Sequence, residues 1–202
     1  MDNKALYTLS CGLFVLTARD GDKDNGCIIN TAMQVSSEPC GISVSVSKGN
    51  YTHDMILKTG KFTVSTLCED ADFELFKRFG FSSGRNTDKF AGFDGCARGE
   101  NGIMYITEST NACIFVNVSK TVDLGSHTMF IGEAENMKVL SDKPSVTYDY
   151  YFKNIKPKPK ENKSGTTVWR CIICGYEYEG EELPSDFICP LCKHPASDFE
   201  KV

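Results

Sequence analysis

The 202-residue chain lacks the long apolar runs that would cross a membrane. No stretch of twenty apolar residues occurs, and the opening Met1-Asp2-Asn3-Lys4 does not begin a signal peptide. An excess of basic residues is also missing, because the formal net charge is −5, which argues against a nucleic-acid partner. These absences predict a cytoplasmic protein that binds neither a membrane nor nucleic acid.

Two common nucleotide-binding motifs are absent as well. The sequence contains neither the Gly-x-Gly-x-x-Gly fingerprint of dinucleotide-binding folds nor the phosphate-binding loop of nucleotide hydrolases. It has no internal repeat, and strand-like and helix-like segments do not alternate in the βαβ manner. We therefore expect a mainly β (α+β) fold built on an antiparallel barrel.

Paired cysteine spacing is missing from most of the chain, although ten cysteines are present. Six of them are scattered through strand-like or turn-like sequence: Cys11, Cys27, Cys40, Cys68, Cys96 and Cys113. This usage favours a reducing cytosol over a disulfide framework, and most of these thiols are expected to be small buried hydrophobic residues. Cys27 lies just before the segment Asn30–Ala32 and is either a buried strand residue or in contact with a cofactor.

The other four cysteines form two Cys-x-x-Cys hooks, Cys171 with Cys174 and Cys189 with Cys192. Two such hooks joined by one short loop can surround one ion with four thiolates, the tetrahedral arrangement that suits zinc or iron. Gly175 allows the turn after the first hook. The spacing alone leaves the choice between zinc and iron open.

The residues around the hooks favour iron. Aromatic side chains crowd this short segment and predict a small core that depends on its metal: Trp169, Tyr176, Tyr178, Phe187 and Phe199. With Cys-Gly-Tyr, Cys-Pro-Leu-Cys and a Ser-Asp-Phe-Glu ending, the segment resembles a rubredoxin, and Lys193 departs from the usual glycine. The resemblance implies a one-electron iron site; a structural zinc ribbon is the alternative.

The rest of the chain is expected to form short strands and two helices. Strands are expected over residues 5–18, 25–36, 42–47, 61–67, 103–107, 113–121 and 128–139, with a turn at Asn25-Gly26. The helices are expected over 53–59, capped by Thr52, and over 69–79, where three phenylalanines recur at helical spacing. We expect domains at 1–152 and 167–202, joined over 153–166 by a Lys-Pro-rich flexible linker.

Three glycine- and hydroxyl-rich segments are suited to a phosphorylated cofactor: Asn30–Ala32, Ser47–Thr52 and Ser82–Lys89. Freed backbone amides, small hydroxyls and a fixed cation are the groups that bind phosphate. In this order, the segments resemble the flavin reductase-like family with its FMN-binding split barrel. The resemblance implies FMN contacts from Asn30, Thr31, Ala32, Ser47, Lys48, Asn50, Thr52, Ser83, Gly84, Arg85 and Lys89.

His127 matches a histidine that contacts nicotinamide in some family members, although Ser126 stands where an aspartate is commoner. The resemblance thus implies a catalytic role for His127 and NAD(P)H as substrate. The alternative is a hydrogen-bonded strand histidine. His53 is expected in the first turn of a helix.

A flavin barrel fused to a rubredoxin resembles the high-molecular-weight rubredoxins. This resemblance implies a homodimeric oxidoreductase that passes electrons from NAD(P)H through FMN to iron, and on to a flavodiiron nitric oxide or oxygen reductase. Two alternatives remain at this stage: an electron carrier that another protein reduces, and a zinc-ribbon binding module.

Overall fold

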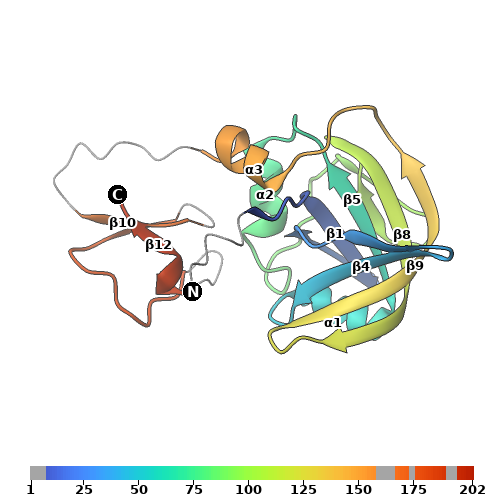
Figure 1. Ribbon diagram of the computed structural model, residues 1–202, viewed down its shortest axis with the longest axis horizontal. Helices are drawn as coiled ribbons and strands as arrows, with labels where there is room; N and C mark the ends of the chain where they lie inside the picture. The colour runs from blue at the N-terminus through green and yellow to red at the C-terminus, as the bar shows by residue number, and fades with distance from the viewer. Residues whose placement is uncertain (1–7, 158–166, 173–175, 190–194) are drawn as a thin grey trace.

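The main feature of the fold is a seven-stranded antiparallel sheet with the strand order β2-β1-β5-β8-β9-β4-β3 (Figure 1). The structure is a computed structural model and describes residues 8–157, 167–172, 176–189 and 195–202. The sheet strands are β1 (Phe14–Asp20), β2 (Lys23–Ile29), β3 (Met33–Ser37), β4 (Cys40–Ser47), β5 (Lys61–Leu67), β8 (Thr110–Asp123) and β9 (His127–Val139). Residues 8–157 are called the body below, and the described residues from 167 onward the tail.

The sheet curls round helix α1 (Tyr51–Thr59) and buries apolar side chains on both faces. On the inner face, Met55 and Ile56 of α1 share one core with residues such as Val44 and Phe130. On the outer face, helix α2 (Phe73–Gly80) and a short hairpin of β6 (Cys96–Arg98) and β7 (Met104–Ile106) cover a second core. Strand β1 therefore has successive residues that are all fully buried, rather than the alternation of a half-exposed strand.

The predicted turn at Asn25-Gly26 is wrong. Gly26 lies inside β2 and pairs with Thr17 of β1. The chain reverses at Gly21 instead, where φ is +58°. Glycine occupies position 26 because a Cβ there would lie 3.1 Å from both the Phe79 ring and the Thr17 methyl group. The predicted strand over 25–36 is divided into β2 and β3, and the first strand begins at Phe14.

Both predicted helices are present, with different first residues. The N-cap of α1 is Asn50 rather than Thr52, and its side chain accepts a hydrogen bond from the backbone N of Thr52 at 2.9 Å. The N-cap of α2 is Asp72, so this helix starts later than position 69. Phe76 and Phe79 are fully buried, which confirms the core-facing stripe.

The body ends in helical structure where the sequence suggested a linker. Helix α3 (Tyr148–Tyr150) continues into a π-helix over Tyr151–Ile155. Tyr151 is buried, and its ring lies 4.6 Å from that of Phe76. The first three residues of the predicted linker are therefore helical, and the remainder from 158 lies outside the described residues.

The tail is a three-stranded sheet with β10 (Val168–Cys171) between β11 (Glu177–Glu179) and β12 (Phe199–Lys201), and a 3₁₀ turn over Ala196–Asp198. The predicted aromatic cluster is present, because the Phe187 ring lies 4.9 Å from Tyr178 and 5.4 Å from Phe199. No helix among the described residues is both long and apolar enough to cross a membrane.

Candidate functional site

A cleft of about 860 Å³ lies where the end of β2, the start of α1 and the loop after α2 meet. Residues from all three predicted cofactor segments line it. Eight of the twelve residues predicted for flavin and nicotinamide contribute to its wall: Asn30, Thr31, Ser47, Asn50, Ser83, Gly84, Lys89 and His127. The fold therefore brings together segments that are up to about a hundred residues apart in the sequence.

The segment between β2 and β3 forms one wall of the cleft and is held by a side chain. The Thr31 hydroxyl donates to the Ser45 carbonyl at 2.8 Å and lies 3.1 Å from the Ser45 backbone N, which donates to it. This pair of bonds mimics a strand pairing and connects the turn to β4. Ala32 packs against the core of the body instead of lining the cleft.

The N-terminus of α1 forms the polar end of the cleft. Ser47, Gly49 and Asn50 line the wall beside it, and the first backbone amides of a helix attract anions. Thr52 is fully buried, and its hydroxyl accepts a 2.9 Å hydrogen bond from the side-chain amide of Asn25. Thr52 therefore supports the helix start from below and does not line the cleft.

The loop over residues 82–89 approaches the body closely at Gly84. A Cβ on Gly84 would lie 2.0 Å from Oδ1 of the buried Asn25 side chain. This separation is far below van der Waals contact, so any side chain there would force either Asn25 or the loop to move. Asn25 thus connects the loop to Thr52 at the start of α1, which fixes two sides of the cleft against each other.

The predicted phosphate cations are engaged with carboxylates. Arg85 pairs with Asp54 at 2.5 Å, and its guanidinium lies 5.0 Å from the centre of the Tyr51 ring. Lys48 pairs with Asp123 at 2.7 Å. Hydrogen bonding from His53, and then from Arg85, lowers the pKa of Asp54. Both cations are half-exposed and lie outside the cleft lining, so each must exchange a carboxylate partner to contact a ligand there.

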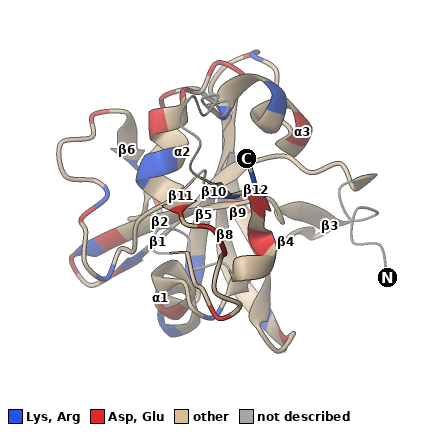
Figure 2. Cartoon of the chain, turned by 90° about the vertical axis from the view of Figure 1, so that its left-hand side faces the viewer, with Lys and Arg blue, Asp and Glu red and all other residues tan. Residues whose placement is uncertain are grey.

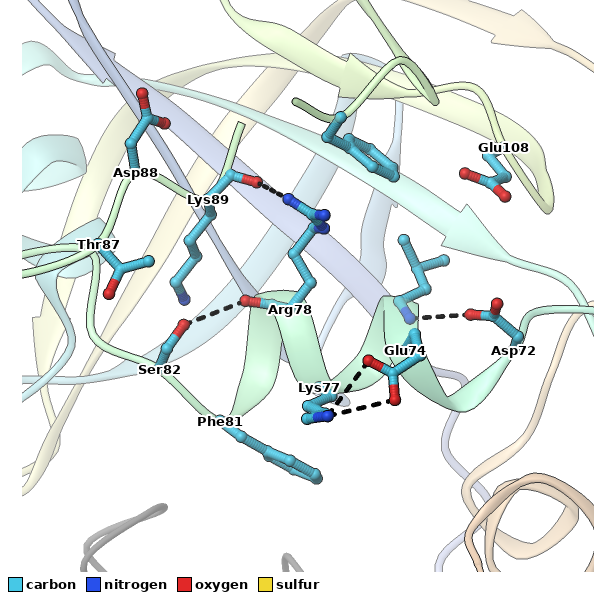
Figure 3. Close-up of a pocket in the computed structure, with 12 residues that line it drawn as sticks. Asp72, Glu74, Lys77, Arg78, Phe81, Ser82, Thr87, Asp88, Lys89 and Glu108 are labelled. Atoms are coloured by element: carbon cyan, nitrogen blue, oxygen red, sulfur yellow. Dashed lines mark hydrogen bonds and ion pairs between the residues drawn. The ribbon is translucent and has the colours of Figure 1, made fainter. Parts of the chain in front are cut away.

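Lys89 is buried and has a structural role. Its Nζ donates to the carbonyls of Gly26 and Phe79, each at 2.9 Å, and burial lowers its pKa. Figure 3 shows its backbone carbonyl accepting a hydrogen bond from Arg78 of α2. Lys89 therefore anchors the loop to β2 and α2, and both hydrogen bonds of its ammonium group are made to the body's own backbone.

His127 begins β9 and is half-buried on the cleft wall. Its Nδ1 lies 2.8 Å from the hydroxyl of Ser126, so this unusual neighbour orients the imidazole ring. His53 is different, because it is buried between Thr128 at 2.9 Å and Asp54 at 3.0 Å. His53 is thus a structural residue in the first turn of α1, as expected.

The apolar end of the cleft was not found from the sequence. Leu13, Tyr148 and Tyr151 line it, together with Phe76 and Phe81 of the α2 region. The tyrosine-rich segment was visible in the sequence, but its position depends on contacts such as Leu13 N donating to the Val146 carbonyl at 3.1 Å. A cleft with hydroxyls and a helix N-terminus at one end and aromatic side chains at the other fits a planar, phosphorylated cofactor.

Cys27 lies beneath the cleft and does not line it. The residue is 3% exposed, and burial raises the pKa of its thiol. The buried-strand alternative for Cys27 is therefore the one that the structure supports.

Two of the four predicted metal ligands lie in the described part of the tail. Cys171 and Cys189 are fully buried beside Tyr176 and Phe199. The Cys171 N donates to the Tyr176 carbonyl at 2.8 Å, which holds the end of β10 to the start of the next described segment. Cys174, Cys192 and Lys193 lie outside the described residues. Buried thiols in an aromatic cluster fit a site whose thiolates bind zinc or iron.

Two family descriptions match different parts of the chain. Residues 6–157 match the flavin reductase like domain, and residues 169–200 match the rubrerythrin, rubredoxin-like domain. The chain is 35% identical to the high molecular weight rubredoxin of Moorella thermoacetica, over 100% of both chains. It is 36% identical to the ferric-chelate reductase (NAD(P)H) of Archaeoglobus fulgidus, over 84% of this chain and 98% of that protein.

Solved structures share the fold of the body. The FMN-binding protein from Thermus thermophilus with bound p-hydroxybenzaldehyde matches with a TM-score of 0.62 and 23% identity. This match covers 69% of the present chain and 82% of the other one. At that identity the likeness concerns the fold alone.

Proposed function

Because this chain belongs to the high-molecular-weight rubredoxins, with a flavin reductase-like domain followed by a rubredoxin-like domain, we propose that it passes electrons from NAD(P)H through FMN to a rubredoxin iron and on to an acceptor protein. The observation that carries the proposal is the cleft, which is polar at the α1 N-terminus and aromatic at the opposite end. Flavin, when bound, accepts two electrons as hydride and can release them singly. The chain is thus a flavin-based oxidoreductase that carries electrons.

FMN is the proposed flavin, with its phosphate at the polar end of the cleft. Backbone and hydroxyl groups of Thr31, Ser47, Asn50 and Ser83 would hold it, and Arg85 would turn from Asp54 to the phosphate. A single phosphate group fits the polar end, because the α1 N-terminus and the loop over residues 82–89 both line the cleft there. His127, oriented by Ser126, is proposed to position the nicotinamide.

The tail is proposed to hold one iron through Cys171, Cys174, Cys189 and Cys192. A four-thiolate iron site transfers one electron at a time, so the tail cannot accept a hydride itself. The proposed acceptor is a redox protein such as a flavodiiron nitric oxide or oxygen reductase. The cytoplasm is the proposed location.

A homodimer is the proposed assembly. Strand β3 is the exposed edge of the sheet, and its Met33 and Val35 side chains are 65% and 49% exposed. An edge strand with exposed apolar side chains favours pairing with a second copy. Sedimentation of the wild-type chain and of a Met33→Lys variant tests this proposal, since the variant should be shifted toward the monomer.

The visible spectrum of the purified protein, recorded anaerobically before and after NAD(P)H, tests the proposed function. We expect flavin and rubredoxin bands that both bleach in the wild type. In Cys189→Ser the iron bands should be lost, because one ligand of a small metal-dependent core is removed, whereas the flavin should still bleach. Zinc in stoichiometric amount with no iron would refute the iron assignment. A flavin that NAD(P)H leaves oxidised would favour a carrier that another protein reduces.

A further inference from the structure

The tail contacts the body at the mouth of the cleft. Phe81 follows α2 as its C-cap residue and lines the cleft; its ring lies 5.6 Å from that of Phe73 in α2 and packs with Cys171 and Cys189 of the tail. Figure 3 shows its ring pointing away from Arg78 and Lys89. A half-buried phenyl ring of the body thus packs against two predicted metal-binding cysteines of the tail.

Two further features join the tail to the body. Pro195 of the tail lines the same cleft, and an isolated β-bridge pairs it with Ile188, the residue before Cys189. Lys156, just after the π-helix, donates to the carbonyl of Ile172 beside Cys171. Figures 1 and 2 place the tail strands on the side of the body that carries α2 and α3. All three contacts involve residues next to the metal-binding hooks.

We propose that this contact docks the rubredoxin-like tail over the mouth of the flavin cleft, and that a nicotinamide can enter only when the tail is undocked. The inference rests on the proposed function. Docking brings the Cys171 and Cys189 thiolates against Phe81, on the wall of the cleft that would hold the flavin. An electron can then pass over a short apolar contact.

The docked tail would exclude a nicotinamide because both would occupy the same part of the cleft. Pro195 and His127 line one cleft, so a nicotinamide beside His127 and the docked tail would compete for the same entrance. The electron count is consistent with a tail that alternates between an undocked and a docked position. One hydride brings two electrons to the flavin with the tail undocked. Each ferric site accepts one of them, so two single-electron transfers to iron, each followed by transfer to the acceptor, complete a turnover.

The chain contains its own reporter of docking, because Trp169 is the single tryptophan and lies in β10, two residues before Cys171. The experiment uses the full chain with FMN bound and zinc in the hooks, since zinc keeps the tetrahedral thiolate site without visible absorption. The measurement is Trp169 emission with FMN divided by emission without FMN. A docked tail should show strong energy transfer to the flavin, independent of protein concentration.

Two variants test the contact. Phe81→Ala and Lys156→Met should each weaken docking, Phe81→Ala by roughly tenfold because it truncates the central apolar anchor, and both should raise the Trp169 ratio. Lys153→Met is the matched control, since Lys153 lies three residues earlier, in the π-helix, and pairs with Asp149 within the body. Oxidised NAD(P)⁺, which cannot reduce the flavin, should raise the wild-type ratio by displacing the tail.

Several results would overturn the proposal. The proposal fails if the Trp169 emission ratio of Phe81→Ala and of Lys156→Met is the same as that of the control Lys153→Met. Loss of energy transfer on dilution would show that a second copy supplies the docked tail. If NADH or NADPH reduces the flavin but NAD(P)⁺ leaves the Trp169 ratio unchanged, the nicotinamide and the docked tail do not compete. That result would leave the proposed function intact. Energy transfer that depends on Phe81, in a protein whose flavin NAD(P)H does not reduce, would support docking of the tail and refute the proposed oxidation of NAD(P)H.

Discussion

Substituting Gly84 by alanine tests how the loop over residues 82–89 is held against the body. The added Cβ would lie 2.0 Å from Oδ1, 2.4 Å from Cγ and 2.7 Å from Nδ2 of Asn25. Asn25 is only 2% exposed and donates its amide to Thr52 at 2.9 Å, so it has little room to move. Either the hydrogen bond to Thr52 breaks or the loop moves out of position.

Breaking the hydrogen bond between Asn25 and Thr52 and displacing the loop have similar free-energy costs. Leaving the buried Thr52 hydroxyl without its donor costs about 1–3 kcal/mol, and displacing a packed segment costs about 1–3 kcal/mol. The reduced freedom of the unfolded chain returns about 0.4–1 kcal/mol on replacing glycine with alanine. We therefore expect Gly84→Ala to lower the free energy of unfolding by about 1–2 kcal/mol, and to weaken flavin binding if the loop moves.

Urea unfolding measures the first effect, and quenching of flavin fluorescence measures the second. Gly49→Ala is the matched control, because Gly49 also lines the cleft and a Cβ there has no atom closer than 3.8 Å. The control should be neutral or slightly stabilising. The double variant Gly84→Ala/Asn25→Ala should be little less stable than Asn25→Ala alone, since the clash is absent once Asn25 is truncated.

The reasoning is refuted if Gly84→Ala unfolds within about 0.5 kcal/mol of the wild type, the range of ordinary surface substitutions, and binds flavin equally well. Strict additivity in the double variant would also contradict it. In that case the destabilisation would have a source other than contact with Asn25.

Three further predictions concern charge and thiol chemistry around the cleft. Arg85→Ala should weaken FMN binding by roughly ten- to a hundredfold, because a charge-assisted phosphate bond contributes about 1.5–3 kcal/mol. Riboflavin, which has no phosphate, should bind to this variant almost as it binds to the wild type. In the control variant Arg98→Ala, whose arginine pairs with Asp24 elsewhere, the binding of both ligands should be unchanged. The pKa of Asp54 is lowered in the folded protein, so its ionised form stabilises the fold above the unfolded pKa of about 3.9, and this stabilisation is lost as the pH falls through the folded value. Asp54→Asn should therefore lower the free energy of unfolding by less than about 1 kcal/mol near pH 7, because the ion pair is exposed. In strongly acidic solution the variant and the wild type should be equally stable. A stability difference that grew on acidification would contradict this reasoning. Cys27 should resist iodoacetamide at pH 8 in the folded protein, because burial raises the pKa of its thiol; mass spectrometry should find the half-buried Cys40 modified first, and equal modification of both would refute the burial argument.

The parts of this protein that could be predicted from sequence are those whose chemistry is local. The hooks at Cys171 and Cys189 are defined by a two-residue spacing, and the stripe of Phe76 and Phe79 by the helical period. The cofactor segments were recognisable because glycine and hydroxyl residues cluster within a few positions. Each of these signals depends on near neighbours in the chain and needs no knowledge of the fold.

The remaining features depend on contacts that the sequence does not display. Asn25-Gly26 has the composition of a turn, but both residues pair with β1 inside β2, and the glycine makes room for the Phe79 ring. Arg85 has the chemistry of a phosphate ligand, and its partner Asp54 lies 31 residues away on a different element. Phe81 and Pro195 meet at one cleft only after the body and tail have folded.

The pairing of Lys48 with Asp123 and of Arg85 with Asp54 also affects how fast a flavin is captured. An array of unpaired cations would attract a phosphate from a distance, and its capture rate would fall steeply with added salt. Here each cation is neutralised locally, and the whole chain has a formal net charge of −5. Flavin association should therefore be slow for its size and nearly insensitive to ionic strength, and its selectivity should arise in the exchange of partners after encounter.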